Sequence, residues 1–255
     1  MSITVLPHAE IGSYLMLDVC KNLFPLFVCQ ERLDKNSLAF VEGGTVRGAV
    51  VVGADFGVFT AWNPWLVADD AAVATALLSR LHARSRTAGL QLAWQYGPVA
   101  IQVCPGLPLT RDLYLRRAAG EISATPRHTA VRVNNEVLTQ VEVPAELRRA
   151  IGDLSDFPTG APFWGLIVDG RLTSIAETLV RVGDCVSIQQ VYTVEDARQQ
   201  GHAKELIGWI LGRPELAGAT VTWLASAANV ASVELARSLG FADFCEFGFL
   251  EATSE

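Results

Sequence analysis

The chain has 255 residues, of which 50% are hydrophobic and 18% are charged, so most of it is too apolar to be disordered. The formal net charge of −7 argues against a protein that holds nucleic acid on a basic face. The charge is unevenly spread: residues 1–125 carry 10 basic and 10 acidic residues, and residues 126–255 carry 10 and 17. We therefore expect two domains of different character, 1–125 and 126–255.

Targeting, membrane and metal signals are missing from the sequence. The start, MSITVLPHAE, lacks the basic and apolar regions of a secretory signal. No apolar run approaches the ~20 residues that span a bilayer. The four histidines and five cysteines include no CxxC and no pair with ligand spacing. We expect a cytoplasmic protein that has no metal and no membrane partner, and that is a monomer or a homodimer.

The first half combines helical and strand patterns. Gly43–Gly44 separates two strand-like runs, which is typical of a hairpin. Asp69 and Asp70 stand where they can cap a helix that ends at Gly89. We expect helices over 8–29 and 71–89, strands over 37–44, 45–54, 55–62 and 90–97, and a short helix and a strand between residues 98 and 120.

The second half repeats nearly the same order of elements. Asp169–Gly170 is a hairpin turn signal. We expect strands over 128–133, 163–170, 171–182, 185–193, 219–226 and 241–252, and helices over 144–154, 201–212 and 229–240. No residue-level repeat links the halves, so a duplication rests on element order alone. The expected fold class is mixed α/β with three layers.

The clearest chemical signal is the stretch VYTVEDARQQGHAKEL, residues 191–206. It predicts a strand that ends at Thr193, a polar loop, and a helix that begins near Gly201. A helix N-terminus presents unpaired backbone N–H groups and favours phosphate. Gly201 lets an anion approach the backbone, and Arg198 can donate charge-assisted hydrogen bonds to it. The alternative is an ordinary strand-to-helix turn that contains an accidental Arg-x-x-Gly.

This loop resembles the Arg/Gln-x-x-Gly-x-Gly/Ala loop of the GNAT superfamily of acyl-CoA N-acyltransferases. The stretch 223–241, WLASAANVASVELARSLGF, is similar to the following strand and helix of that family. The resemblance covers residues 126–255 and implies a GNAT fold there, with a degenerate GNAT-like first half in a tandem arrangement. It also implies acetyl-CoA as co-substrate and a primary amine of a small molecule or peptide as acceptor.

The resemblance assigns cofactor-binding residues one by one. The backbone of the preceding strand would line the pantetheine arm, the loop would surround the pyrophosphate, and the later asparagine would lie beside the arm. These residues are Val191, Tyr192 and Thr193; Arg198, Gln199, Gly201, His202, Ala203 and Lys204; and Asn229. We expect His202 to be structural rather than catalytic, facing the phosphates or solvent from the first helical turn.

Acid and base groups are harder to assign. In the strand TSIAETLVR, Glu177 shares a face with Ile175, Leu179 and Arg181. Burial there would raise its pKa toward that of a general base. The alternatives are an ion pair with Arg181 or exposure on an open face.

The group that would protonate the departing thiolate differs from the family pattern. Ala236 stands where many relatives have a tyrosine acid, which leaves Ser232, a water molecule, or unassisted departure of the thiolate. A coenzyme A-binding regulatory or scaffold protein without turnover therefore remains an alternative function, and a plain interaction domain is a third. The first half has Asp69 and Asp70 where the loop would be, so we expect it to lack a usual coenzyme site.

Overall fold

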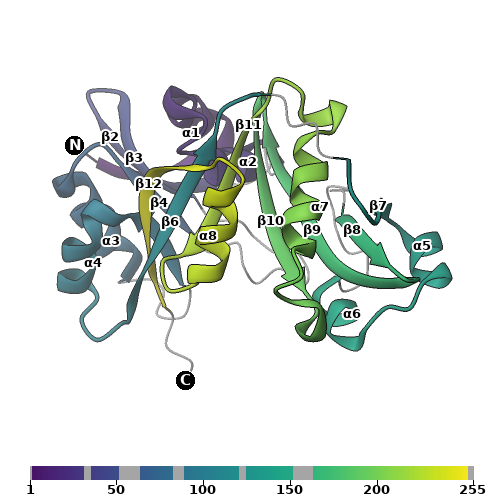
Figure 1. Ribbon diagram of the computed structural model, residues 1–255. Helices are drawn as coiled ribbons and strands as arrows, with labels where there is room; N and C mark the ends of the chain where they lie inside the picture. Colours follow the sequence, from purple (N-terminus) through teal and green to yellow (C-terminus); the bar gives the residue numbers. More distant parts are fainter. Residues whose placement is uncertain are drawn as a thin grey trace. The chain divides into compact units, whose positions relative to one another are not determined.

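The computed structural model describes residues 2–31, 36–51, 64–82, 89–120, 125–151 and 163–251 (Figure 1). The chain divides into two compact units. Unit 1 contains Met1–Tyr114, Ala225–Asn229 and Phe244–Glu255, and unit 2 contains Leu115–Leu224 and Val230–Asp243. Unit 1 thus includes the end of the chain, which the sequence analysis placed with the second half. A domain boundary near residue 125 stays a prediction.

Unit 1 is built on a mixed sheet with the strand order β1-β2-β3-β4-β5-β12-β6. Neighbours from β1 to β4 are antiparallel, β4 and β5 are parallel, and β12 pairs antiparallel with β5. The strands are β1 (Ser2–Pro7), β2 (Asn36–Glu42), β3 (Thr45–Val51), β4 (Trp65–Ala68), β5 (Leu90–Ala93), β6 (Leu109–Arg117) and β12 (Ala242–Leu250); the helices are α1 (His8–Leu15), α2 (Leu23–Glu31), α3 (Ala71–His82) and α4 (Gly97–Val103).

Three expectations for unit 1 need correction. The strand expected over 90–97 is only β5 (Leu90–Ala93), because Trp94–Tyr96 form a 3-10 helix and Gly97 begins α4. The single helix expected over 8–29 is α1 and α2, because the Asn22 side chain donates to the Leu15 carbonyl (2.9 Å) and closes α1. Strand β1 was not foreseen, because its mostly exposed edge position gives no alternating apolar pattern. The strand expected over 55–62 lies outside the described residues.

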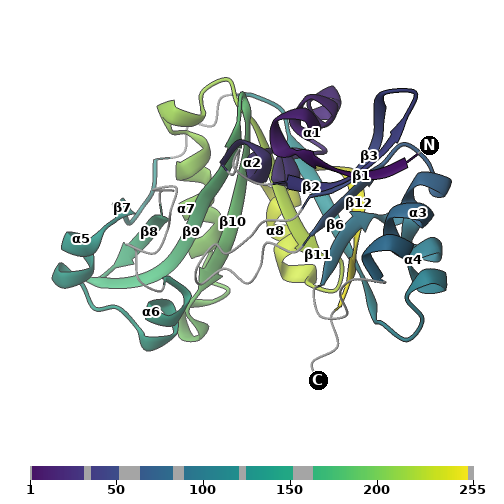
Figure 2. The same cartoon turned by 180° about the vertical axis from the view of Figure 1, so that it is seen from behind.

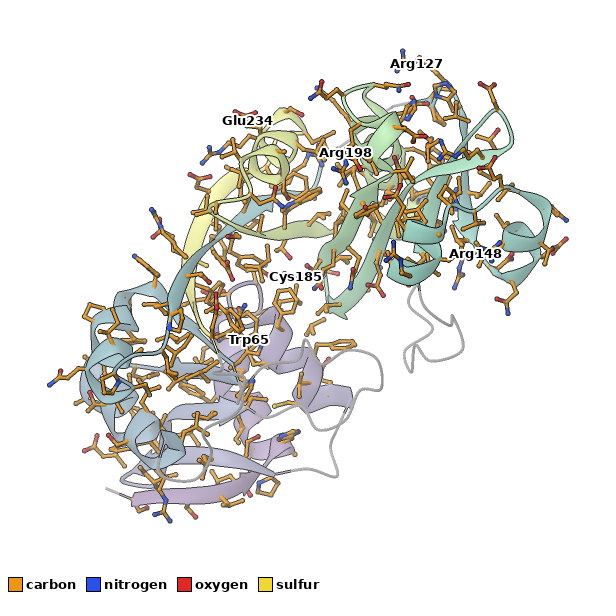
Figure 3. All side chains as sticks on the ribbon, turned by 90° about the horizontal axis from the view of Figure 1, so that it is seen from below. Trp65, Arg127, Arg148, Cys185, Arg198 and Glu234 are labelled. Atoms are coloured by element: carbon orange, nitrogen blue, oxygen red, sulfur yellow. The ribbon has the colours of Figure 1, made fainter. Side chains whose placement is uncertain are left out.

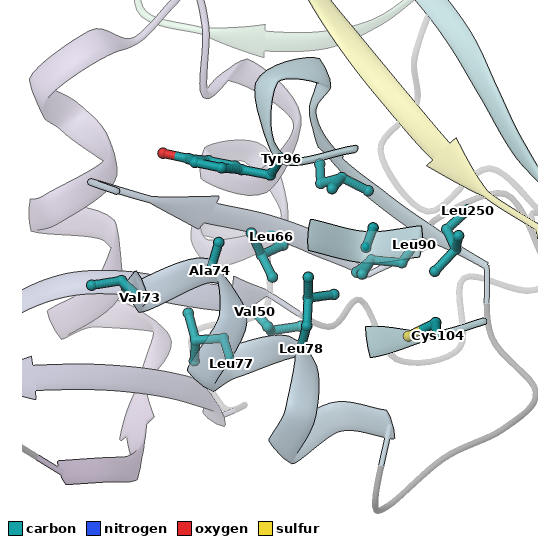
Figure 4. Close-up of a cluster of buried hydrophobic side chains, with 12 residues drawn as sticks. Val50, Leu66, Val73, Ala74, Leu77, Leu78, Leu90, Tyr96, Cys104 and Leu250 are labelled. Atoms are coloured by element: carbon teal, nitrogen blue, oxygen red, sulfur yellow. The ribbon is translucent and has the colours of Figure 1, made fainter. Parts of the chain in front are cut away.

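The core of unit 1 packs α3 and α4 against the sheet. Leu77 and Leu78 of α3 and Leu92 of β5 are essentially buried, and Leu250 of β12 joins the same cluster (Figure 4). Strand β12 therefore contributes to this core. A tight apolar cluster of this kind stabilises a fold but offers no chemistry of its own.

Unit 2 has the strand order β11-β10-β9-β8-β7. The neighbours from β7 to β10 are antiparallel, and β10 and β11 are parallel. The predicted hairpin is confirmed: Asp169 and Gly170 have φ values of 48° and 79°. The strands are β7 (Thr129–Val133), β8 (Phe163–Val168), β9 (Arg171–Val182), β10 (Cys185–Thr193) and β11 (Thr220–Ser226); the helices are α5 (Asn135–Gln140), α6 (Ala145–Ile151), α7 (His202–Leu211) and α8 (Val230–Ser238).

The two faces of this sheet are covered by different helices. On one face, Trp209 of α7 packs edge-on against Trp164 of β8, with ring centroids 5.5 Å apart (Figure 1). On the other face, seen from behind in Figure 2, Phe163 and Ile175 form a core with Leu147 of α6. Neighbouring strand residues point to opposite faces. Phe163 therefore faces the layer that contains α6, and Trp164 faces the layer that contains α7.

The units repeat one connectivity. Each begins with a strand and two helices, continues through three antiparallel strands and a helix, and then adds a parallel strand and another helix. The mixed α/β fold class predicted from the sequence is confirmed. None of the helices in the described ranges is both long enough and apolar enough to cross a membrane.

Candidate functional site

The loop between β10 and α7 has the backbone geometry of an anion cradle. Gln199 and Gly201 have positive φ values of 61° and 84°, and such alternation turns successive N–H groups inward. Gly201 is the N-cap of α7, and no described side chain caps this helix end. The backbone N–H groups of His202, Ala203 and Lys204 are therefore left for another partner. Because φ is positive at Gly201, a side chain there would be strained.

Strand β10 changes partners just before this loop. Its described parallel pairing with β11 covers Cys185–Ile188, while β10 itself continues to Thr193. Gln190 has a positive φ of 51°, and the register with β9 shifts on either side of Gln189. Such a bulge bends a strand and redirects its backbone groups. The backbone of Val191, Tyr192 and Thr193 thus runs beyond the described pairing with β11.

Arg198 folds back onto the strand. Its Nε donates to the Thr193 carbonyl (3.1 Å), and its guanidinium lies 5.6 Å from the centroid of the Tyr192 ring. The Tyr192 hydroxyl in turn donates to Glu146 of α6 (2.9 Å). The sequence did not indicate Glu146, because helix and loop are 46 residues apart along the chain. Arg198 is thus held mainly by β10 and lies beside the cradle.

His202 is buried, so of its two expected orientations the one toward solvent is wrong, and the one toward the phosphates stays a prediction. Its ring packs edge-on against His128, with centroids 5.4 Å apart. Burial lowers the pKa of His202, with a further contribution from His128, so the neutral ring is favoured. The first turn of α7 is also tied to the segment before β7, because Glu205 accepts the backbone N–H of His128 (2.7 Å).

Glu177 lies fully buried in the middle of β9. It pairs in register with Phe163 of β8 and Gln189 of β10. Neither carboxyl oxygen has a hydrogen-bond partner among the described residues. Burial raises the pKa of Glu177 from 4.5 to about 7. A carboxyl with such a pKa can gain and lose a proton near neutral pH, as a general base must.

Both structural alternatives for Glu177 are wrong. Its side chain is not exposed, and Arg181 does not pair with it. Arg181 instead donates to the carbonyl of Glu215 (2.8 Å) and to that of Gly183. Ile175 is buried on the Glu177 face, as predicted, and the side chain of Leu179 lies outside the described residues.

The remaining predicted residues lie on and before α8. Ser232 accepts a hydrogen bond from the indole of Trp223 (3.0 Å), which orients its hydroxyl. Ala236 is fully buried, and its methyl side chain offers no proton donor at this position. Asn229 is exposed and its backbone N–H donates to the Ser226 carbonyl. Its place beside a pantetheine arm stays a prediction.

Comparison with known families identifies the domain that carries this loop. Residues 132–241 match the family model described as the acetyltransferase (GNAT) family. These residues form a GNAT acetyltransferase domain. The match includes β10, the loop, α7 and Glu177, so the predicted family resemblance is confirmed. No curated protein matches the chain.

Solved structures extend the likeness to the whole chain. A Drosophila protein is 14% identical with a TM-score of 0.66, and 99% of each chain is covered. A GCN5-related N-acetyltransferase from Sphaerobacter thermophilus is 12% identical with a TM-score of 0.61, over 97% of this chain and 94% of that chain. A tandem GNAT protein from the clavulanic acid biosynthesis pathway is 14% identical with a TM-score of 0.55, and both chains are fully covered. At these identities the likeness shows the fold alone, and it is the GNAT fold.

The loop of the GNAT domain fits the pyrophosphate of coenzyme A. A Cβ built on Gly201 has Arg127 Nη2, 3.9 Å away, as its nearest described neighbour. The open space at Gly201, the uncapped N–H groups and the nearby cation are what a phosphate requires. Among the described residues, no group of three His, Cys, Asp or Glu side chains is placed to hold a metal.

Unit 1 differs at the equivalent helix start. Only Asp69 and Asp70 separate β4 from α3, whereas eight residues, 194–201, separate β10 from α7 in the GNAT domain. Asp70 caps α3 by accepting the N–H of Val73 (2.9 Å), as predicted. Asp69 instead pairs with Arg47 and accepts the Tyr14 hydroxyl. Carboxylates therefore stand at this helix N-terminus.

The end of β4, just before α3, already has a side-chain hydrogen-bond partner. The Tyr96 hydroxyl donates to the Ala68 carbonyl (2.8 Å) at the last residue of β4. The Tyr96 ring is buried at the border of the core cluster, with its hydroxyl directed away from the leucines (Figure 4). The described pairing of β4 with β5 covers only Trp65 and Leu66, so Tyr96 binds the strand just beyond it.

Proposed function

We propose that the GNAT domain is an acetyl-CoA-dependent N-acetyltransferase that acts on a primary amine of a small molecule or peptide. The observation that carries this proposal is the buried, unpartnered carboxyl of Glu177 in the same domain as the uncapped loop. A buried carboxyl without a hydrogen bond costs stability. A catalytic role explains why such a costly group is placed in the sheet.

The proposed coenzyme site uses backbone groups more than side chains. The N–H groups of His202, Ala203 and Lys204 would bind the pyrophosphate, with Gly201 giving close access and Gln199 shaping the turn. The backbone of β10 from Val191 to Thr193 would hydrogen-bond the pantetheine arm. Arg198 would support this arrangement by fixing the Thr193 carbonyl. The family resemblance also implies Asn229 as a pantetheine contact.

The proposed chemistry divides two proton transfers between two residues. An amine at neutral pH is protonated and must lose a proton before its nitrogen can attack the thioester carbon. Glu177, with a pKa of about 7, takes up this proton. The nitrogen–carbonyl bond forms, the carbon–sulfur bond breaks, and the departing thiolate needs a proton. Ser232 is the proposed donor, because the Trp223 N–H bound to its oxygen makes the hydroxyl a better donor. The serine oxygen then regains a proton from the attacking nitrogen, which carries one proton too many once its bond to the carbonyl carbon has formed.

A second function is favoured by one specific observation. Ala236 occupies the position of the usual tyrosine acid and is fully buried. The alternative is therefore a coenzyme A-binding regulatory or scaffold protein without turnover. Both functions require coenzyme A to bind, and they differ only in whether an amine accelerates thiol release.

Calorimetric titration with coenzyme A tests the binding that both functions share. We expect one coenzyme A per chain, bound by the GNAT domain. Unit 1 is expected to bind none, because Asp69 and Asp70 repel phosphate at α3 and Tyr96 engages the end of β4. The matched experiment is the same titration of the Gly201→Val variant, in which the single site should bind well over tenfold more weakly. Two equivalents per chain, or a site that keeps the parent affinity in the variant, would contradict the assignment for unit 1, and no binding to the parent would contradict the proposed function.

A further inference from the structure

The predicted phosphate ligand Arg198 is partly committed elsewhere. Its Nε bonds the Thr193 carbonyl and its guanidinium lies over the Tyr192 ring. The loop that it belongs to also carries exposed acidic residues, Glu195 and Asp196. A cation from outside the loop would therefore strengthen the binding of a pyrophosphate at Gly201.

Arg127 is placed to supply that cation. It lies before β7, outside the loop motif and outside the family match at residues 132–241. Its Nη2 is 3.9 Å from the point where a Cβ on Gly201 would lie. That distance puts the guanidinium beside the one residue of the loop where an anion can approach the backbone most closely. The Arg127 side chain thus reaches the backbone of Gly201, which is 74 positions later in the sequence.

The contacts of Arg127 leave its guanidinium available. It forms an ion pair with Glu205 Oε2 at 3.4 Å, a long contact, and its side chain is 72% exposed. The Glu205 side chain is only 8% exposed, so the ion pair is open to water on the arginine side alone. The position of Arg127 is set by its neighbour, because Glu205 accepts both the backbone N–H and the ring Nδ1 of His128. The segment is fixed by His128 while the Arg127 side chain stays in solvent beside the loop.

We infer that Arg127 is a pyrophosphate-contacting residue of the coenzyme site, supplied by the segment before β7 in addition to the loop. The inference rests on the proposed function, since it assumes that coenzyme A binds at this loop. Arg127 would donate charge-assisted hydrogen bonds to phosphate oxygens, and such bonds are about twice as strong as neutral ones. A guanidinium has five N–H donors and can keep one on Glu205.

Two variants break the same ion pair and have opposite expected results. Arg127→Met removes the cation but keeps a long side chain, and the dissociation constant for coenzyme A should rise about tenfold. Glu205→Gln removes the carboxylate but can still accept the His128 N–H, so affinity should be unchanged or tighter. The control is Arg148→Met, an exposed arginine of α6 that lies well away from Arg127 (Figure 3). It should bind as the parent does.

Two ligands that differ by one phosphate show which phosphate group Arg127 contacts. Titration calorimetry is done with coenzyme A and with 3′-dephospho-coenzyme A, which keeps the pyrophosphate. The Arg127→Met variant should lose about the same factor for both. A loss confined to coenzyme A would move Arg127 to the 3′-phosphate and overturn the inference. Unchanged affinity in Arg127→Met, or an equal loss in Glu205→Gln, would also overturn it. Failure of the parent to bind coenzyme A would instead remove the proposed function on which the inference rests.

Discussion

The Glu177→Gln variant is expected to lose turnover and gain stability at the same time. Glutamine keeps the shape of the side chain but cannot accept a proton, so kcat should fall about 10²–10⁴-fold. The affinity for acetyl-CoA should change little, because Glu177 is not part of the proposed coenzyme site. In the parent, the rate should rise with pH through about 7 as the carboxyl ionises, and in the variant this rise should be absent.

The stability gain follows from the same raised pKa. The folded state keeps the Glu177 proton up to about pH 7, whereas the unfolded chain loses it near 4.5. The folded state thus binds more protons between these values, and the free energy of unfolding of the parent falls as pH rises through this window. Above pH 7 the penalty is complete, at about 3 kcal/mol. The advantage of the glutamine variant should be absent below pH 4.5, grow between 4.5 and 7, and then stay constant.

Thermal unfolding and steady-state kinetics at pH 4.5 to 8.5 measure both effects. The matched control is Glu234→Gln, an exposed carboxylate on α8 (Figure 3), which should leave rate and stability unchanged. A Glu177→Gln enzyme with the parent rate and the parent pH profile would remove Glu177 from the mechanism. A variant that loses stability at pH 8 would contradict the unpartnered carboxyl.

The Gly201→Val variant should lose coenzyme A affinity by well over tenfold, which is more than ~1.4 kcal/mol. Valine adds a branched side chain beside the N–H groups that would bind the phosphate. It must also adopt a φ of 84°, which costs roughly 1–2 kcal/mol for a residue with a Cβ. Loss of stability and loss of affinity must therefore be separated.

Gly218→Val separates them. Gly218 has a φ of 77°, nothing lies within 4 Å of its Cβ position, and it belongs to the same unit before β11. Both variants should unfold at a lower temperature than the parent. Only Gly201→Val should bind coenzyme A more weakly in titration calorimetry. Equal affinities in the two variants would place the pyrophosphate elsewhere.

Local signals in the sequence predicted the parts of the structure that local chemistry decides. The Asp169–Gly170 hairpin, the Asp70 cap and the start of α7 after Gly201 each follow from a few adjacent residues. Strand alternation predicted that Glu177 shares a face with Ile175, but it left open whether that face is buried. The sequence did not predict that Glu177 lacks a partner, because Arg181 donates instead to the carbonyl of Glu215, 34 positions later in the chain.

Long-range pairing accounts for what the sequence did not reveal. The pairing of β12 with β5 joins residues more than about 150 positions apart. Nothing in the sequence of either strand indicates which strand it pairs with. Arg127 and Glu146 reach the loop from segments with no motif, so no spacing rule could find them. The correction to His202 has the same origin, since its ring packs against His128, 74 positions earlier in the chain.

Release of free thiol from acetyl-CoA in the presence of primary amines tests the central claim most directly. The parent protein should release thiol above the amine-free background with at least one small-molecule or peptide amine. The Glu177→Gln variant should lose that amine-dependent release, and Glu234→Gln should keep it. If coenzyme A binds but no amine in a panel of small molecules and peptides raises thiol release above background, the chain is a binding protein and the claim of acetyl transfer is wrong.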